Sequence, residues 1–322
     1  MNTDWEAIDE FWAGFTTDHE ALFIPSATRV LPDISVAEEW DTVDTFWDGY
    51  VADHAPDLEL LETLLATVCS QWQTPSGAFS SDPLTADWGS TSSQDGPLRP
   101  TSHEEEWSQW LAHLLRTSSG PFLSELLGLP NKPAQTVRRE IEFSDADSTR
   151  RIDILVEYPD TAASIEVKNG DRHLTKTPET ARLIEQSTTW SWTHILLLQR
   201  ENQRRLHRTF GEAVTSDAES RPTIENQDTP AVDVRYWDDV SRTLRRMLTE
   251  GLEADTHWQA SAYLFITLIE QRILTLESMD LLDSQLATDS AGSQTLHRLI
   301  ATDPEQQIQY LQTLIAEDST HE

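Results

Sequence analysis

Two β-strands and a tight turn are encoded in one segment, Arg151-Ile-Asp-Ile-Leu-Val-Glu-Tyr-Pro-Asp-Thr-Ala-Ala-Ser-Ile-Glu-Val-Lys168. The middle of this segment favours a turn because proline occupies the second position. If the turn is centred between Pro159 and Asp160, Asp153 lies directly opposite Glu166. Side chains alternate along a strand, so Asp153, Glu166 and Lys168 then share one face. The segment therefore predicts a hairpin with two acids and a lysine on one side.

The other face of the predicted hairpin is apolar. It carries Ile152, Ile154, Val156, Ala163, Ile165 and Val167. Directly opposed Cβ atoms in such a hairpin lie about 4.5–5.5 Å apart, so the two carboxylates are close enough to share one cation. A single register thus predicts both a surface for the hydrophobic core and a polar site.

The polar face has the residue types that suit divalent-metal chemistry on phosphate groups. Carboxylate oxygens, water and a substrate phosphate together make a suitable coordination shell for Mg²⁺. Such an ion polarises a phosphoryl group and lowers the pKa of its bound water. The ammonium of Lys168, two residues after Glu166, is placed to reach that water or the charge that develops on the phosphate.

The surrounding sequence predicts an α/β fold. A capping-box pattern, Ser102 followed by Glu105, opens an amphipathic helix. Strands are then predicted at residues 136–143, 151–157, 162–168, 194–199 and 231–237, with helices at 178–190 and 238–248. The order helix, three strands, helix, strand indicates a mixed central sheet flanked by helices.

The spacing of the acids and the lysine resembles the PD-(D/E)XK nuclease superfamily, which includes many restriction endonucleases and Holliday-junction resolvases. Asp153 is followed, after a gap of twelve residues, by Glu166-Val-Lys168 on the predicted hairpin. The resemblance implies a three-layer, restriction-endonuclease-like core over about residues 101–248. It further implies that Asp153 and Glu166 bind Mg²⁺ or Mn²⁺ and that Lys168 acts on the attacking water. Ile152 stands where many members have proline.

The resemblance also implies an acid from the first helix as a metal ligand. Glu104 fits the pattern Glu-x-x-apolar-Ser/Thr-x-x-Leu-Ala, because Trp107-Ser108 and Leu111-Ala112 follow at the required positions. Glu105 and Glu106 remain alternatives for this role.

A further catalytic candidate comes from the helix after the motif. Some members of the superfamily carry Gln-x-x-x-Tyr there, and Gln186 and Trp190 occupy that spacing in this chain. The resemblance therefore makes Gln186 a candidate catalytic residue.

The function implied by the resemblance is that of a Mg²⁺-dependent endonuclease that hydrolyses phosphodiester bonds, with DNA as the expected partner. Residues 99–250 hold 20 basic and 25 acidic residues, so this segment is nearly balanced and would tolerate a polyanion. For Lys176 and Arg182, a phosphate contact and a plain surface position both remain open. The alternative function is a catalytically silent module of the same fold that binds nucleic acid or a protein partner.

The chain divides into three predicted regions. Residues 1–98 form an acidic helical region in which the segment 5–19 recurs 35 residues later, followed by a linker from about residue 74. Residues 99–250 hold the nuclease-like domain, and residues 251–322 form a C-terminal helical region with helices at 257–279 and 293–317. Because the repeat is rich in aromatic residues, the helical ends are expected to contact a protein partner or a second copy of the chain.

The composition sets the broad class of the protein. The 322 residues carry 23 Lys and Arg against 56 Asp and Glu, a net charge of −33, yet they include 12 Trp, 9 Phe and 5 Tyr. This aromatic content indicates a folded chain rather than an acidic disordered one. Only three of the basic residues are lysines, a usage that resembles the cytoplasmic proteins of salt-in halophiles. We therefore expect loss of structure at low salt, where the acidic surface repels itself.

The sequence also carries expectations about location. No apolar run is long enough to cross a bilayer, and the first residues lack the basic and apolar regions of a signal peptide. The single cysteine, Cys69, excludes a disulfide framework. A cytoplasmic location without membrane association is expected.

Overall fold

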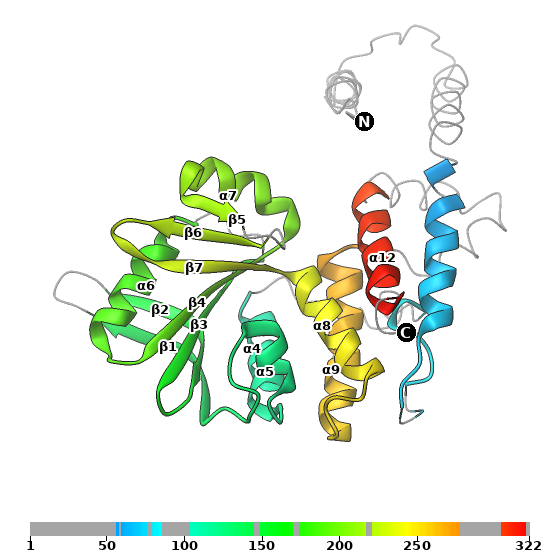
Figure 1. The fold of residues 1–322 in the computed structure, drawn as a ribbon, viewed down its shortest axis with the longest axis horizontal. Coiled ribbons are helices and arrows are strands. Elements are labelled where there is room, and N and C mark those ends of the chain that lie inside the picture. The colour runs from blue at the N-terminus through cyan, green and yellow to red at the C-terminus, as the bar shows by residue number, and fades with distance from the viewer. Residues whose placement is uncertain are drawn as a thin grey trace, which may run out of the picture. The chain divides into compact units, whose positions relative to one another are not determined.

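A mixed sheet of seven strands forms the centre of the described part of the chain (Figure 1). The strands are β1 Thr136–Ser144, β2 Thr149–Glu157, β3 Thr161–Val167, β4 Ser191–Leu198, β5 Val214–Ser216, β6 Pro222–Asn226 and β7 Thr229–Tyr236. Their order across the sheet is β1-β2-β3-β4-β7-β6-β5. The pairs β3–β4 and β4–β7 are parallel and all other pairs are antiparallel.

Helices cover both faces of this sheet, which gives three layers (Figure 1). The helices are α4 Glu104–Thr117, α5 Pro121–Leu127, α6 Lys176–Ser187, α7 Gln203–Phe210, α8 Trp237–Thr249, α9 Thr256–Leu268 and α12 Pro304–Ser319. Side chains of α4, α5, α8 and α9 form one large core with one face of β2, β3 and β4. Side chains of α6 and α7 pack on the other face. The central strands are buried on both faces, as expected for the parallel part of an α/β sheet.

The computed structural model describes residues 56–57, 59–75, 77, 79–85, 104–144, 149–169, 174–216, 221–276 and 304–319. All of them belong to one compact unit that runs from Pro56 to Glu322. The boundaries expected near residues 98 and 250 fall inside this unit. The predicted repeat in residues 5–54 lies outside the described residues. None of the described helices combines the length and apolar character that crossing a bilayer requires.

The predicted order of helix, three strands, helix and strand is confirmed, with the short helix α5 inserted before β1. The structure differs from the prediction in the polar stretch after β4, where α7, β5 and β6 form. The described part of the expected linker is also packed rather than loose. Leu84 in the 3₁₀ turn Pro83–Thr85 is fully buried, and the ring of Phe79 stacks on Tyr263 of α9.

The helical extensions join the core through a second cluster of apolar side chains. Residues 59–71 form a helix that packs, through Leu61 and Leu65, with Leu84 and with Tyr310 and Leu311 of α12. Of the predicted C-terminal helices, the first is α9 and the π-helical turn Ile269–Ile273 that continues it. The second is α12, which begins at Pro304.

Candidate active site

The register predicted for the β2–β3 hairpin is present in the structure. Ile154 pairs with Ile165 and Leu155 with Ser164, as the predicted turn requires. Asp153 and Glu166 are the next residues on the two strands. The register therefore brings these two acids to adjacent positions at the open end of the hairpin.

The Asp153 side chain closes this end of the hairpin. Its Oδ2 atom accepts a hydrogen bond of 2.7 Å from the backbone N–H of Val167. On the other side, the β1–β2 ladder is regular at Arg139–Ile154 and Ile141–Ile152 but skips the pair between them. The residue opposite Asp153 there is Glu140, which has a φ of 52°. A left-handed conformation is uncommon for a residue with a side chain, so the irregularity of the sheet is concentrated at Asp153.

One part of the predicted alternation is wrong at this point. Ile152 was expected to share a face with Ile154, which packs in the core with α4 and α8. Instead, Ile152 packs with Leu155, Ala162 and Ile184 on the α6 side of the sheet. The interruption of the ladder at Asp153 explains the change, because alternation holds only while the strand stays regularly pleated.

Glu166 and Lys168 lie next to one another at the end of β3. The Nζ atom of Lys168 is 2.9 Å from Oε1 of Glu166, and the two side chains are 12% and 19% exposed. The backbone N–H of Lys168 donates to the carbonyl of Leu197 in β4, which continues the parallel pairing one residue past the strand. This bond holds the lysine on the same side as the acid.

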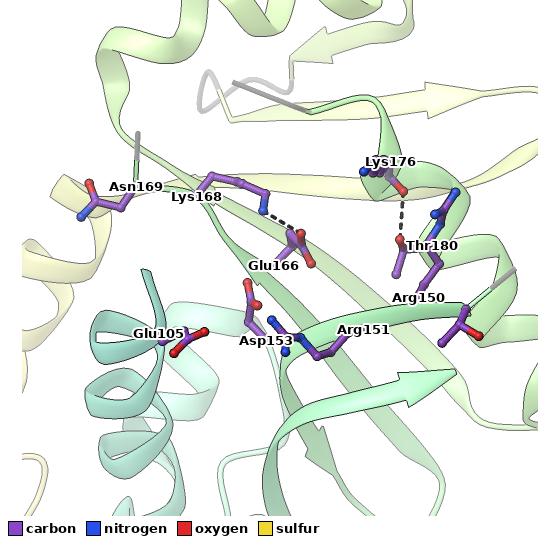
Figure 2. Close-up of a pocket in the computed structure, with 10 residues that line it drawn as sticks. Glu105, Arg150, Arg151, Asp153, Glu166, Lys168, Asn169, Lys176 and Thr180 are labelled. Carbon is purple, nitrogen blue, oxygen red and sulfur yellow. Dashed lines mark hydrogen bonds and ion pairs between the residues drawn. The ribbon is translucent and has the colours of Figure 1, made fainter. Parts of the chain in front are cut away.

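An open cavity of about 650 Å³ lies over these three side chains. It is lined by Glu105 of α4, Thr149, Arg150, Arg151 and Asp153 of β2, Glu166, Lys168 and Asn169 at the end of β3, and Lys176 and Thr180 of α6. Figure 2 shows Asp153 and Glu166 pointing toward one another from neighbouring strands, with Lys168 above Glu166. The structure thus brings together the three residues that form the predicted motif.

The acid from the first helix that lines the cavity is Glu105. Glu104, the first choice from the sequence pattern, begins α4, and its side chain lies outside the described residues. The start of α4 is tied to the sheet by Arg139 of β1. Its Nη2 atom donates to the carbonyl of Glu105 at 2.7 Å and to the hydroxyl of Ser108 at 3.1 Å. Arg139 therefore positions the turn of helix that presents Glu105.

Gln186 is not brought to the cavity. It is exposed near the C-terminal end of α6, whereas Lys176 and Thr180 at the other end of the same helix line the cavity. Because α6 lies between the parallel strands β3 and β4 in the chain, it runs back along the sheet, and its two ends lie at opposite ends of these strands. The structure gives Gln186 no place in the candidate site.

Four cationic side chains line the cavity; two of them, both arginines, were not considered from the sequence, and the sequence left Lys176 open between a phosphate contact and a plain surface position. Besides Lys168 these are Arg150, Arg151 and Lys176. Arg182, which the sequence left equivalent to Lys176, is exposed on α6 and does not line the cavity. The scarcity of lysine was the signal in the sequence for Lys176. The chain has only three lysines, and two of them line this cavity.

Metal binding at this site would depend on few protein ligands. Among the described residues there is no group of three or more His, Cys, Asp and Glu side chains arranged to hold a metal ion. The site offers the carboxylates of Asp153 and Glu166, with Glu105 presented from α4 to one side of Asp153. Magnesium sites on phosphate substrates commonly use one or two protein carboxylates, with water and phosphate oxygens completing the shell.

No protein-family model, curated protein or solved structure matches this chain.

Proposed function

We propose that the protein is a metal-dependent nuclease that hydrolyses phosphodiester bonds in DNA and that its core is restriction-endonuclease-like. The observation that supports this proposal best is the convergence of Asp153 from β2 with Glu166 and Lys168 from β3 in one open cavity. The order of elements around the hairpin agrees with the same fold.

Mg²⁺ or Mn²⁺ fits the donor set of this cavity, because hard divalent cations prefer carboxylate oxygens. Asp153 and Glu166 would hold the ion, and Glu105 is the helix acid available to it. When bound, such an ion lowers the pKa of water and offsets the negative charge of the phosphate. The hydrogen bond from Val167 fixes the Asp153 carboxylate before any ligand arrives.

In this proposal Lys168 is a positively charged hydrogen-bond donor. Its ammonium is held 2.9 Å from Glu166 and remains partly exposed to the cavity. A phosphate oxygen or an attacking water in the cavity would accept a hydrogen bond from Nζ. Such a preorganised donor stabilises the charge that develops during hydrolysis.

The proposal is tested by a cleavage assay in molar KCl with Mg²⁺ or Mn²⁺, on linear, supercoiled and single-stranded DNA. We expect Asp153→Asn and Lys168→Met each to lower the cleavage rate by at least about 10²–10³-fold, because each removes a group that acts on the reacting phosphate. Circular dichroism checks that both variants remain folded.

The chain offers a matched control for each change. Asp160→Asn alters an exposed acid in the turn of the same hairpin, and Lys132→Met alters an exposed lysine outside the cavity. Both controls should cleave at the wild-type rate. If folded wild-type protein binds DNA without turnover under all of these conditions, the proposal is wrong and the catalytically silent module is the better description.

A further inference from the structure

The charge of the cavity differs from the charge of the rest of the chain. The protein carries a net charge of −33, but the cavity is lined by four cationic side chains and three carboxylates. Clefts in which one sign of charge is in excess concentrate ligands of the opposite sign. In so acidic a protein, a locally positive cavity indicates an anionic ligand.

Two of these cations have no role in the folded chain that the structure shows. Arg151 and Lys176 are exposed, and neither side chain has an ion-pair partner among the described residues. The third, Arg150, lies with its Nη2 atom 3.0 Å from Oε2 of Glu179 on α6. Arg150 is partly exposed, at 30%, and Glu179 is exposed, at 57%, so the pair contributes little to stability and can exchange partners.

The cavity has an acidic side and a basic side. In Figure 2, Glu105 comes from α4 on one side, whereas Lys176 and Arg150 lie on the other side, with Asp153, Glu166, Lys168 and the guanidinium of Arg151 between them. The basic side includes the first turn of α6, where the hydroxyl of Thr180 donates to the carbonyl of Lys176 at 2.9 Å. The partial positive charge of a helix N-terminus adds to that of the side chains.

The size of the cavity exceeds what one phosphate group requires. A volume of about 650 Å³ lies within the range of sites that enclose a complete small ligand, about 300–1,000 Å³. A nucleic-acid strand that places one phosphate at Asp153 and Glu166 would therefore extend toward one wall of the cavity.

We propose that Arg150 and Lys176 form a subsite for a second, non-scissile phosphate of the substrate strand, and that Arg151, beside Asp153, contacts the strand on its way to this subsite. The inference rests on the proposed function and assigns the direction in which the strand leaves the catalytic residues, toward the N-terminus of α6. Glu179 competes with this phosphate for Arg150 and weakens the subsite.

The salt dependence of DNA binding tests the subsite without cleavage. The Asp153→Asn protein, which should bind without cutting, is combined with Lys176→Gln, Arg151→Gln, Arg182→Gln or Glu179→Gln. Binding to a fluorescent duplex is then measured over a range of KCl concentrations at which circular dichroism shows folded protein. The logarithm of the binding constant falls linearly with the logarithm of the salt concentration. Each lost phosphate contact reduces the magnitude of this slope by about 0.9.

We expect Lys176→Gln and Arg151→Gln to lower the slope by about this amount and to weaken binding about tenfold, because a hydrogen bond to a charged group is lost. Arg182→Gln removes the same charge from the same helix, outside the cavity, and should leave the slope unchanged. Glu179→Gln should strengthen binding a few-fold by releasing Arg150. Equal slopes for Lys176→Gln, Arg151→Gln and Arg182→Gln would overturn the subsite.

The same substitutions are also made in the protein with Asp153 intact, and their rates of cleavage are measured. These rates distinguish the nuclease proposal from the subsite proposal. If the slopes change as expected but the wild-type protein never cleaves, the subsite is supported and the nuclease assignment is wrong. If the wild-type protein cleaves and Lys176→Gln changes neither its KM nor its salt slope, the nuclease assignment stands and the subsite is wrong.

Discussion

Two clusters in this molecule have the same chemical composition, two carboxylates and one cation, and opposite surroundings. One is the candidate active site, with Asp153, Glu166 and Lys168. The other, with Asp82, Glu270 and Arg245, lies where α8, the π-helical turn and the segment before α4 meet. In the second cluster both acids have fully buried side chains, and that of Arg245 is 7% exposed.

The buried cluster is saturated with hydrogen bonds. The guanidinium of Arg245 donates to both oxygens of Asp82, at 2.7 and 2.8 Å, and to both oxygens of Glu270, at 2.6 and 2.9 Å. The hydroxyls of Ser241 and Tyr310 donate to Glu270 as well. Burial disfavours the charged form of Arg245, but Asp82 and Glu270 outweigh it and hold the pKa of the guanidinium well above its ordinary value.

The difference between the clusters lies in the cation and in access to solvent. Arginine presents a planar fork that serves two carboxylates at once, whereas the lysine ammonium is a single point of charge. Lys168 lies against Glu166, and that cluster opens on a cavity of about 650 Å³. Two carboxylates and one cation are therefore buried in the core in the Arg245 cluster, whereas in the candidate active site they face an open cavity.

The largest effect on stability is expected from a substitution of Arg245. Replacement by Met leaves two buried carboxylates without their cation, so we expect a loss of about 3–5 kcal/mol in the free energy of unfolding. Denaturant titration in molar KCl measures it. Adding Asp82→Asn and Glu270→Gln to Arg245→Met should restore most of the loss, because the buried charges are then gone. A single Arg245→Met variant as stable as the wild type would show that the cluster does not hold the helices together.

Conservative exchanges of the two cations distinguish the roles of the two clusters. Arg245→Lys should cost about 2 kcal/mol, because one ammonium cannot replace the hydrogen bonds to both buried acids. Lys168→Arg should change stability by less than about 0.5 kcal/mol, since the site is partly exposed, yet lower the rate of cleavage about 10²-fold. Unfolding and cleavage are measured on both variants. Arg245→Lys should mainly lower stability, and Lys168→Arg should mainly lower the rate of cleavage. Equal losses of stability in the two variants would contradict the assignment of separate roles.

A buried histidine gives a predicted effect on stability that appears only at low pH. His194 in β4 lies with Nδ1 2.7 Å from the hydroxyl of Ser164, and its ring stacks on Trp192. Burial lowers the pKa of His194 from 6.5 to about 4. Glu185 would favour the charged form, but it is 3.5 Å from Nε2 and 45% exposed, so water screens it.

Because the unfolded chain binds a proton at His194 below about pH 6.5 and the folded chain does not until about pH 4, stability should fall as the pH is lowered through this window. Between pH 7 and pH 5 we expect the wild type to lose about 2 kcal/mol more than His194→Gln. Parallel stability curves for wild type and His194→Gln would show that His194 contributes nothing to the pH dependence.

Sequence reasoning succeeded where structure is local. The β2–β3 register and the order of the central elements follow from alternating apolar residues and a proline turn, which act over a few residues. It failed for α7, β5 and β6, because their residues are largely polar and exposed and leave no clear apolar period. The described part of the expected linker also looked like a loop from its composition, yet Leu84 and Asp82 are buried by partners distant in the chain.

The same distinction holds for the candidate site. Asp153, Glu166 and Lys168 belong to one hairpin, so their proximity could be predicted from pairing alone. The side chain of Glu105 requires the rotation of α4 against the sheet, and that of Lys176 requires the placement of α6. Neither is encoded in local spacing. Gln186 was selected by spacing alone, which ignores the direction in which the helix runs.

The salt bridge between Arg245 and Asp82 joins residues 163 positions apart in the chain. A fragment cut to residues 99–250 would keep the hairpin of Asp153 but leave the guanidinium of Arg245 with neither of its acids, since Asp82 precedes the fragment and Glu270 follows it. In such a fragment, water would have to solvate the guanidinium of Arg245, which is buried in the whole protein. The hairpin of the candidate site therefore folds as part of a larger unit, and proteolysis between the segments should yield pieces that stay associated and do not fold alone.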